Sequence, residues 1–194
     1  MAKMAVEVLR SPQDRVVEAA EKVAIVVGAS LFVALCAHIT IPLPFTPVPL
    51  TVQNFAVLLV GLMLGSRRGF AALALYLAEG ASGLPVFSPL PLGPGGVAHI
   101  IGVTGGFLMA YPFVAFLAGF IFERGTKTFA RAATAALLGE ILLFAGGVGW
   151  LYYLTHSLAR AAYLGFYWFM AAEVMKVMFA AAIAVRWRKV GRQQ

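Results

Sequence analysis

The stretch TVQNFAVLLVGLMLGSRRGFAALALYLAEGA, residues 51–81, decides how many times this chain crosses a membrane. It is longer than the roughly 20 apolar residues that cross a bilayer once, and Arg67 and Arg68 lie near its middle. Two consecutive arginines at mid-bilayer would cost several kcal/mol. We therefore expect two short helices, residues 52–65 and 70–81, joined by a turn that carries both arginines. At 1.5 Å per residue the second helix is only about 18 Å long and does not span the hydrocarbon alone.

The whole chain has the composition of a membrane protein. Of its 194 residues, 61% are hydrophobic and 12% are charged, against about 45–50% and 25% in soluble domains. A soluble globule of this size has too little interior to hide so much apolar surface. The composition therefore excludes a soluble enzyme, a disordered tail and a disulfide scaffold. The single cysteine, Cys36, is interpreted as a small buried hydrophobic residue.

Four further apolar runs surround the predicted hairpin. They cover residues 23–41, 104–122, 132–154 and 161–185, and each is about as long as a bilayer crossing or longer. The expected fold class is an all-α integral membrane protein. It is a six-transmembrane-helix bundle with structured external lid loops between helices 1 and 2 and between helices 3 and 4.

The two ends of the chain flank this membrane domain, which we place at residues 23–187. Residues 1–22 are expected to form a cytoplasmic or interfacial segment, and Ser-Pro-Gln-Asp at residues 11–14 predicts the start of a short interfacial helix within it. Residues 188–194 are expected to form a basic cytoplasmic tail.

Positive charge gathers in alternate connections. The opposite connections carry only Arg160, and Lys176 lies within the sixth span. Because cytoplasmic loops carry an excess of Lys and Arg, we expect both termini in the cytoplasm and the protein in the cell membrane. The net charge of +7 then reflects membrane orientation, so the lipid bilayer is expected as a partner and nucleic acid is not. The cations on the cytoplasmic side are Lys3, Arg10, Arg15, Lys22, Arg67, Arg68, Arg124, Lys127, Arg131, Arg186, Arg188, Lys189 and Arg192.

Two connections on the opposite side are stiff and apolar. Residues 42–49 read PLPFTPVP, and residues 82–103 hold four prolines, five glycines and no Asp, Glu, Lys or Arg. Proline restricts both its own backbone and that of the preceding residue. Irregular backbone at membrane depth must be buried by protein or face a cavity, so we expect lids that fill the depth left by the short third helix. The alternative is a pair of ordinary extracellular loops.

Glu173 and Lys176 mark the candidate binding site. They lie three residues apart on the sixth predicted helix and therefore share one face. Ionisable residues inside a membrane are costly and indicate function by default, and together these two offer an acceptor and a cation to a bound molecule. The alternative is an ion pair that only locks helix packing, since buried pairs are weak evidence for stability.

Other polar and aromatic residues have less specific readings. Glu79, at the outer end of the third helix, can reach the lid region, whereas Glu140 fits a packing or partner role as well as ligand contact. His99 is interpreted as a loop histidine with satisfied hydrogen bonds. Trp150 follows three glycines within residues 146–149, which leave room beside its ring for a ligand.

Small residues line the first predicted span. Ala24, Gly28, Ser30 and Ala34 recur at near-helical spacing, and such faces let another helix approach closely. We expect a partner interface here, with packing inside the bundle as the equally open alternative.

Five motifs occur in a fixed order over about residues 25–185. They are IPLPFTPVPLT at 41–51, LGSRRG at 64–69, GLPVFS at 83–88, GVTGGF at 102–107 and Glu-x-x-Lys at 173–176. In this run the chain resembles the biotin-specific substrate-binding (S) components of energy-coupling factor (ECF) transporters, the BioY family. Glu173 is one methylene longer than the aspartate usual in that family, and Val103 replaces a proline.

The resemblance implies a six-helix bundle that captures biotin outside and delivers it inward. It also implies partners: a transmembrane coupling subunit and two ATPase subunits, which alone use ATP. The chain itself would need no cofactor and no metal. The alternative function is a solitary ion-coupled carrier for a small carboxylate-bearing vitamin, with Glu140 or Glu173 titrating. An enzyme is not expected, because no nucleophile, metal set or second catalytic group stands at a recognisable spacing.

Biotin offers a carboxylate, a ureido ring and an apolar middle. We expect Lys176 to meet a carboxylate or ureido oxygen and Glu173 to accept ureido N–H groups. The remaining expected binding residues come from the lids, the third helix and the starts or ends of neighbouring helices. They are Phe45, Thr46, Val48, Glu79, Phe87, Ser88, Thr104 and Trp150.

Overall fold

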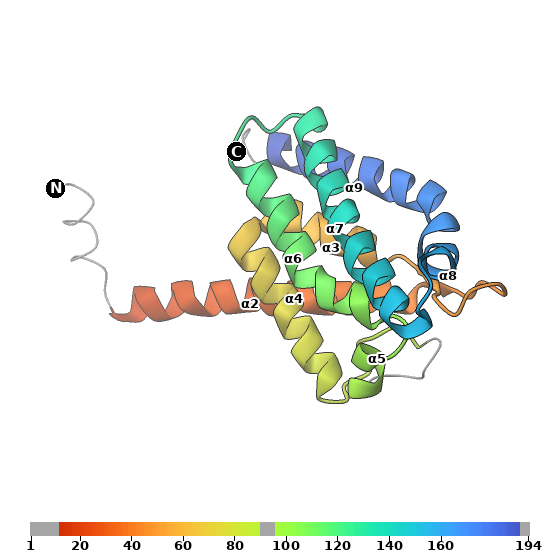
Figure 1. The fold of residues 1–194 in the computed structure, drawn as a ribbon. Helices are drawn as coiled ribbons and strands as arrows, with labels where there is room; N and C mark the ends of the chain where they lie inside the picture. The colour runs from red at the N-terminus through yellow and green to blue at the C-terminus, as the bar shows by residue number, and fades with distance from the viewer. Residues whose placement is uncertain (1–11, 90–95, 191–194) are drawn as a thin grey trace.

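The computed structural model describes residues 12–89 and 96–190, which are almost entirely helical (Figure 1). A two-residue antiparallel ladder, β1 (Thr40–Ile41) with β2 (Leu50–Thr51), is a feature that the all-α prediction missed. The helices are α2 (Pro12–His38), α3 (Gln53–Leu64), α4 (Ser66–Ala81), α5 (Val97–Ile101), α6 (Gly105–Glu123), α7 (Phe129–Thr155), α8 (Leu158–Ala162), the π-helical turn η1 (Tyr163–Tyr167) and α9 (Met170–Val190).

Three of the described helices are long and apolar enough to cross a membrane, namely α2 from Gln13 onward, α6 and α7. The consecutive segments α8–η1 and α9 add a fourth crossing if they count as one bent span. By contrast, α3 and α4 have only 12 and 16 residues, fewer than the roughly 20 that span a bilayer. Helix length therefore supports a helical membrane protein and leaves six crossings as a prediction.

The helix α6 lies at the centre of the bundle, packed against α3, α4 and α7 (Figure 1). Small residues permit this packing. A Cβ atom at Gly61 of α3 would lie 2.5 Å from the carbonyl oxygen of Ala115 on α6, so only glycine allows the two backbones to approach so closely.

The predicted helical hairpin is present, but its turn is tighter than expected. Gly65, with φ of 83°, alone separates α3 from α4, a conformation that glycine adopts without steric cost. The third helix begins at Ser66 rather than residue 70, because Glu123 of α6 caps it. The Ser66 backbone N–H and hydroxyl donate to Glu123 at 3.0 and 2.6 Å. Arg67 and Arg68 lie exposed in the first turn of α4.

The first helix differs from its prediction. We expected a short interfacial helix and a separate span from residue 23, but α2 is one continuous helix of 27 residues. After Pro12 no proline interrupts it, and its single glycine, Gly28, costs only about 1 kcal/mol. Its N-terminal half projects away from the other helices (Figure 1). Ser11, at the predicted start of the short interfacial helix, lies outside the described residues.

The last predicted span is broken. Residues 161–185 were expected to form one helix, whereas α8–η1 and α9 meet at an angle of 47°. The π-helical turn ends at Tyr167, and Trp168 and Phe169 separate it from α9. This break positions Glu173 in the first turn of α9.

Candidate functional site

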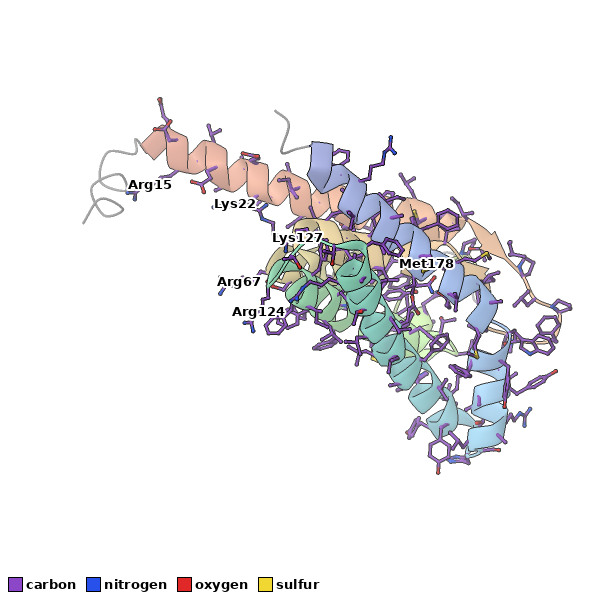
Figure 2. All side chains as sticks on the ribbon, turned by 90° about the horizontal axis from the view of Figure 1, so that it is seen from above. Arg15, Lys22, Arg67, Arg124, Lys127 and Met178 are labelled. Atoms are coloured by element: carbon purple, nitrogen blue, oxygen red, sulfur yellow. The ribbon has the colours of Figure 1, made fainter. Side chains whose placement is uncertain are left out.

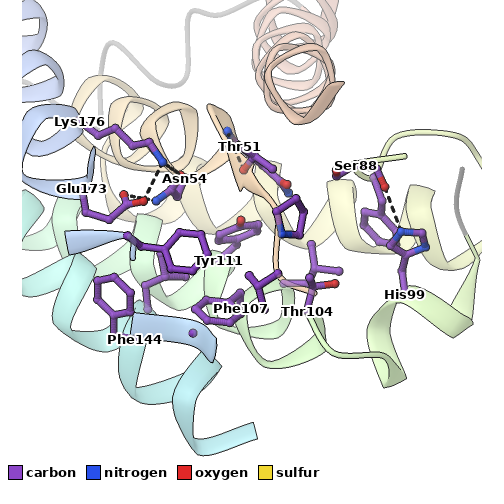
Figure 3. Close-up of a pocket in the computed structure, with 18 residues that line it drawn as sticks. Thr51, Asn54, Ser88, His99, Thr104, Phe107, Tyr111, Phe144, Glu173 and Lys176 are labelled. Carbon is purple, nitrogen blue, oxygen red and sulfur yellow. Dashed lines mark hydrogen bonds and ion pairs between the residues drawn. The ribbon is translucent and has the colours of Figure 1, made fainter. Parts of the chain in front are cut away.

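One cavity is lined by residues of α3, α6, α7, α9 and the two long connections (Figure 3). Its charged end consists of Asn54 on α3 with Glu173 and Lys176 on α9. The Lys176 Nζ donates to Glu173 Oε1 and to Asn54 Oδ1, both at 2.7 Å, and Asn54 Nδ2 donates to Glu173 Oε2. Each of the three side chains therefore contacts the other two.

The charged end combines burial with unused hydrogen-bonding capacity. The Glu173 and Lys176 side chains are only 7% and 14% exposed, so their attraction is weakly screened by solvent. A carboxylate has about four lone-pair positions and an ammonium three hydrogens. Each group therefore retains capacity for a ligand, with Glu173 able to accept N–H groups and Lys176 able to donate to an oxygen.

The lid end of the cavity consists of Thr51, Ser88, His99 and Thr104 (Figure 3). His99 is 1% exposed, and its Nε2–H donates to the Ser88 carbonyl oxygen at 3.0 Å. Its Nδ1 has no hydrogen-bond partner among the described residues. The lid end thus offers hydroxyl groups and one unpaired ring nitrogen, without a formal charge on any of the four side chains when His99 is neutral.

Apolar and aromatic side chains connect the two ends. Phe87 is fully buried and sits directly on Gly80, where a Cβ atom would come within 2.0 Å of the ring. Its ring also meets Tyr76 edge-on, with 5.3 Å between centroids. The other apolar or aromatic residues of the wall are Val48, Pro49, Phe107, Leu108, Tyr111, Leu143, Phe144 and Phe169.

The proline-rich connection is fastened to the segment that leads into α9. The β1–β2 ladder pairs Thr40 with Thr51 at its base, and the Thr46 hydroxyl donates to the Leu164 carbonyl oxygen at 2.6 Å. At its tip the Phe45 ring packs against Trp168, with 4.2 Å between centroids. Residues 42–49 are therefore tied to η1 and Trp168, and their role as an external lid stays a prediction.

Comparison with known proteins identifies the family. The BioY family model matches residues 6–193. The chain belongs to the BioY family. It is 36% identical over 167 residues to "Biotin transporter BioY" of Thermotoga maritima, covering 84% of this chain and 95% of the relative. It is also 37% identical over 158 residues to "Probable biotin transporter BioY" of Pyrococcus horikoshii, covering 81% and 91%.

A solved structure of similar fold supports this assignment. It is described as the crystal structure of "the S-component for biotin from an ECF-type ABC transporter", and it superposes on this BioY chain with a TM-score of 0.79 at 25% identity. The match covers 93% of this chain and 95% of the other. The fold of this BioY protein is therefore that of an ECF S component.

Six of the binding residues expected from the sequence line this one cavity. They come from the proline loop, the long connection, the start of α6 and the first turns of α9. Their contact with a ligand stays a prediction, but their convergence is a finding. The six are Val48, Phe87, Ser88, Thr104, Glu173 and Lys176.

Four expected residues do not line this cavity, and each has a different partner. Phe45 packs on Trp168 at the outside of the loop, and Thr46 turns to the Leu164 backbone. The Trp150 Nε1–H donates to the Gly102 carbonyl oxygen at 2.8 Å and thereby supports the start of α6. Glu79 accepts a hydrogen bond from Ser30 on α2. These contacts link elements to one another instead of facing the cavity.

The expected partner face on α2 divides in two. Ala24 and Gly28 are exposed, and nothing lies within 4 Å of a Cβ atom at Gly28. Ser30 and Ala34 are 0% and 7% exposed and pack inside the bundle. For these two residues the internal-packing alternative is correct, because α2 packs its second half against α3 and α4.

Sequence-based prediction missed the residues of α3 and α6 that line the cavity together with the charged pair. Asn54 was overlooked because a single amide in an apolar run gives no spacing signal, although polar groups in a membrane helix are themselves a pointer to function. Tyr111 and Phe107 were lost among many aromatic residues. His99 was read as a satisfied loop residue, yet it lies in α5 with one nitrogen unpaired among the described residues.

Within the described residues no group of three His, Cys, Asp or Glu side chains is placed to hold a metal ion.

Proposed function

We propose that this chain is the biotin-binding S component of an ECF-type transporter, and that the cavity between the charged end and the lid end holds the vitamin. The observation that carries the proposal is the spacing of polar groups at both ends of an apolar, aromatic wall. Biotin has the complementary pattern, with a ureido ring, an apolar middle and a carboxylate. Small-molecule sites are mostly apolar with a few placed polar groups.

The charged end suits the ureido ring. Glu173 accepts the ureido N–H groups, and Lys176 donates to the ureido oxygen, so that both members of a buried pair gain a partner. The carboxylate then lies at the lid end, near the hydroxyl groups and His99. The names of the relatives and of the similar solved structure support biotin as the cargo.

The decisive experiment is a calorimetric titration of the purified, detergent-solubilised chain with biotin, and with riboflavin and thiamine as controls. Biotin alone should bind tightly with a stoichiometry of one. Absence of biotin binding, or equal binding of the three vitamins, would contradict the proposed function. Uptake by vesicles that hold only this chain and a pH gradient would instead favour the solitary ion-coupled carrier.

The proposed topology has six crossings with both termini in the cytoplasm. In this topology α3 and α4 are the second and third crossings, and the two lids fill the part of the bilayer depth that these short helices do not span. The segments α8–η1 and α9 together form the sixth crossing. In a Cys36→Ser background, Phe45→Cys and Leu84→Cys should react with an impermeant thiol reagent from outside, and Thr126→Cys only from inside. Labelling of residue 126 from outside would reject this topology.

The proposed partners are a transmembrane coupling subunit and two ATPase subunits, and the exposed Ala24–Gly28 face of α2 is the proposed contact. Gly28→Trp should then lower biotin transport by the complete complex while leaving binding by the isolated chain unchanged. The matched variant Ala34→Trp inserts the same ring into a buried position, which costs about 1–3 kcal/mol of stability. Normal transport by Gly28→Trp would exclude this face as the contact.

A further inference from the structure

Glu140 is a buried acid for which the proposed binding mode provides no role. It lies in the middle of α7 and is only 3% exposed. Neither of its carboxyl oxygens has a hydrogen-bond partner among the described residues. It does not line the cavity.

Donor groups lie near Glu140, but none of them bonds to it among the described residues. From α9 it faces Glu173 and Lys176, and from α6 it faces Tyr111. Glu140 and Glu173 lie within hydrogen-bonding reach of each other, yet two ionised carboxylates offer only acceptors. The assigned hydrogen bonds of Lys176 go to Glu173 and Asn54 instead.

An ionised Glu140 is therefore expensive in this position. Transfer of an unpaired carboxylate into an apolar interior is costly enough that the group normally takes up a proton instead. A protonated carboxyl gains an O–H donor, and the Glu173 carboxylate is an acceptor within its reach. One proton on Glu140 therefore gives its buried carboxyl a hydrogen-bond partner and also supplies the Glu173 carboxylate with a further donor.

We propose that Glu140 binds a proton and donates it in a hydrogen bond to Glu173, making Glu140 a positioning residue behind the charged end of the cavity. Glu173 is then held by three donors, from Lys176, Asn54 and Glu140. The proton also keeps the charged end neutral, since Glu173 and Lys176 cancel. Loss of the proton would add a negative charge beside Glu173 and repel an anionic vitamin. This last consequence rests on the proposed function.

The proton is tested by infrared spectroscopy on the ligand-free protein in detergent at pH 7. The wild-type chain should show the carbonyl stretching band of a protonated carboxylic acid, and Glu140→Gln should lose it. Glu123→Gln is the control, because Glu123 is an exposed acid that accepts from Ser66, and the band should remain. A wild-type spectrum without this band, or a band undiminished in Glu140→Gln, would overturn the proposal.

The positioning role is tested by rescue. Glutamine keeps a neutral N–H donor at this place, so Glu140→Gln should bind biotin as the wild type does. Glu140→Ala leaves Glu173 without its third donor and should weaken binding at least about tenfold, the scale of one hydrogen bond to a charged group. Equal losses in the two variants, with both still folded by circular dichroism, would reject the role. The infrared measurement needs no biotin, so it separates this proposal from the proposed function.

Discussion

The two ends of the cavity are built in different ways. At the charged end, three side chains from α3 and α9 bond directly to one another. At the lid end, His99 donates to the Ser88 backbone, the Thr51 hydroxyl accepts from the Gln53 backbone N–H, and the Ser88 hydroxyl bonds to that of Thr40. One end is fixed by the register of two helices, whereas the other depends on how two irregular connections fold.

This difference suggests separate roles: the charged end provides most of the binding energy, and the lid end controls how fast the ligand leaves. Residues on helices are held in place by packing along the whole element, so the charged end can be formed before a ligand arrives. The lid end holds its position by a few hydrogen bonds and by ring packing such as that of Phe87 on Gly80. We therefore expect substitutions at the charged end to change affinity most, and substitutions at the lid end to change the dissociation rate.

The largest effect is expected for Lys176→Ala, which leaves Glu173 buried without its cation. Biotin binding should weaken by about 2–5 kcal/mol, at least about 30-fold, as measured by calorimetry. The control is Lys22→Ala, which removes the similar pair with Glu18 at 2.7 Å, where the two side chains are 53% and 43% exposed. That variant should bind normally, since exposed pairs contribute little. Wild-type affinity in Lys176→Ala would contradict the assigned site.

Asn54→Leu should have the next largest effect. It removes the donor to Glu173 Oε2 and the acceptor for Lys176 while keeping a similar volume. Hydrogen bonds to charged groups contribute about 1.5–3 kcal/mol, and a loss of that size is expected in the calorimetric affinity. Gln53→Leu, on the same helix and also in the cavity wall, breaks the bond to Tyr76 instead and should cost less, because neither partner is charged. The opposite ranking would show that the charged end is not the main source of affinity.

Gly80→Ala tests the lid end through Phe87. The new methyl group overlaps the ring and must displace it from the wall. Such overpacking costs about 1–3 kcal/mol, seen as a lower thermal unfolding temperature together with faster biotin dissociation. Gly28→Ala is the control, because a Cβ atom there meets nothing within 4 Å. If both variants behave as the wild type does, Phe87 does not depend on Gly80.

The smallest effect is expected for Thr46→Val, an almost isosteric change that removes the hydrogen bond to the Leu164 carbonyl oxygen and the acceptor of the Val48 N–H. About 0.5–1.5 kcal/mol should be lost, and stopped-flow measurement should show faster biotin release with little change in association. Thr134→Val removes a comparable bond to Ala130 within α7 and should leave release unchanged. Slower association in Thr46→Val would indicate that the loop shapes the open site instead.

Periodicity and charge predicted much of the membrane domain. The hairpin at Arg67 and Arg68, the start of α6 after Thr104 and the long α7 follow from apolar runs ended by cations or glycines. The break before α9 was not predictable, because residues 161–172 carry no charged residue and no proline, and a π-helical turn has no composition of its own. The continuity of α2 was missed because the charged residues between Pro12 and Lys22 are compatible both with a separate interfacial helix and with the first turns of a longer one.

The sequence by itself determined the class of protein, which follows from composition, and the adjacency of Glu173 and Lys176, because residues three apart on a helix are neighbours. Tertiary structure alone decided that Asn54 closes that pair, that Trp150 and Glu79 turn away from the cavity, and that Glu140 lies behind it. These contacts join residues far apart in the chain, and they depend on helix rotation and on the 47° bend before α9. No local pattern encodes such a rotation, since it results from the packing of all the helices together.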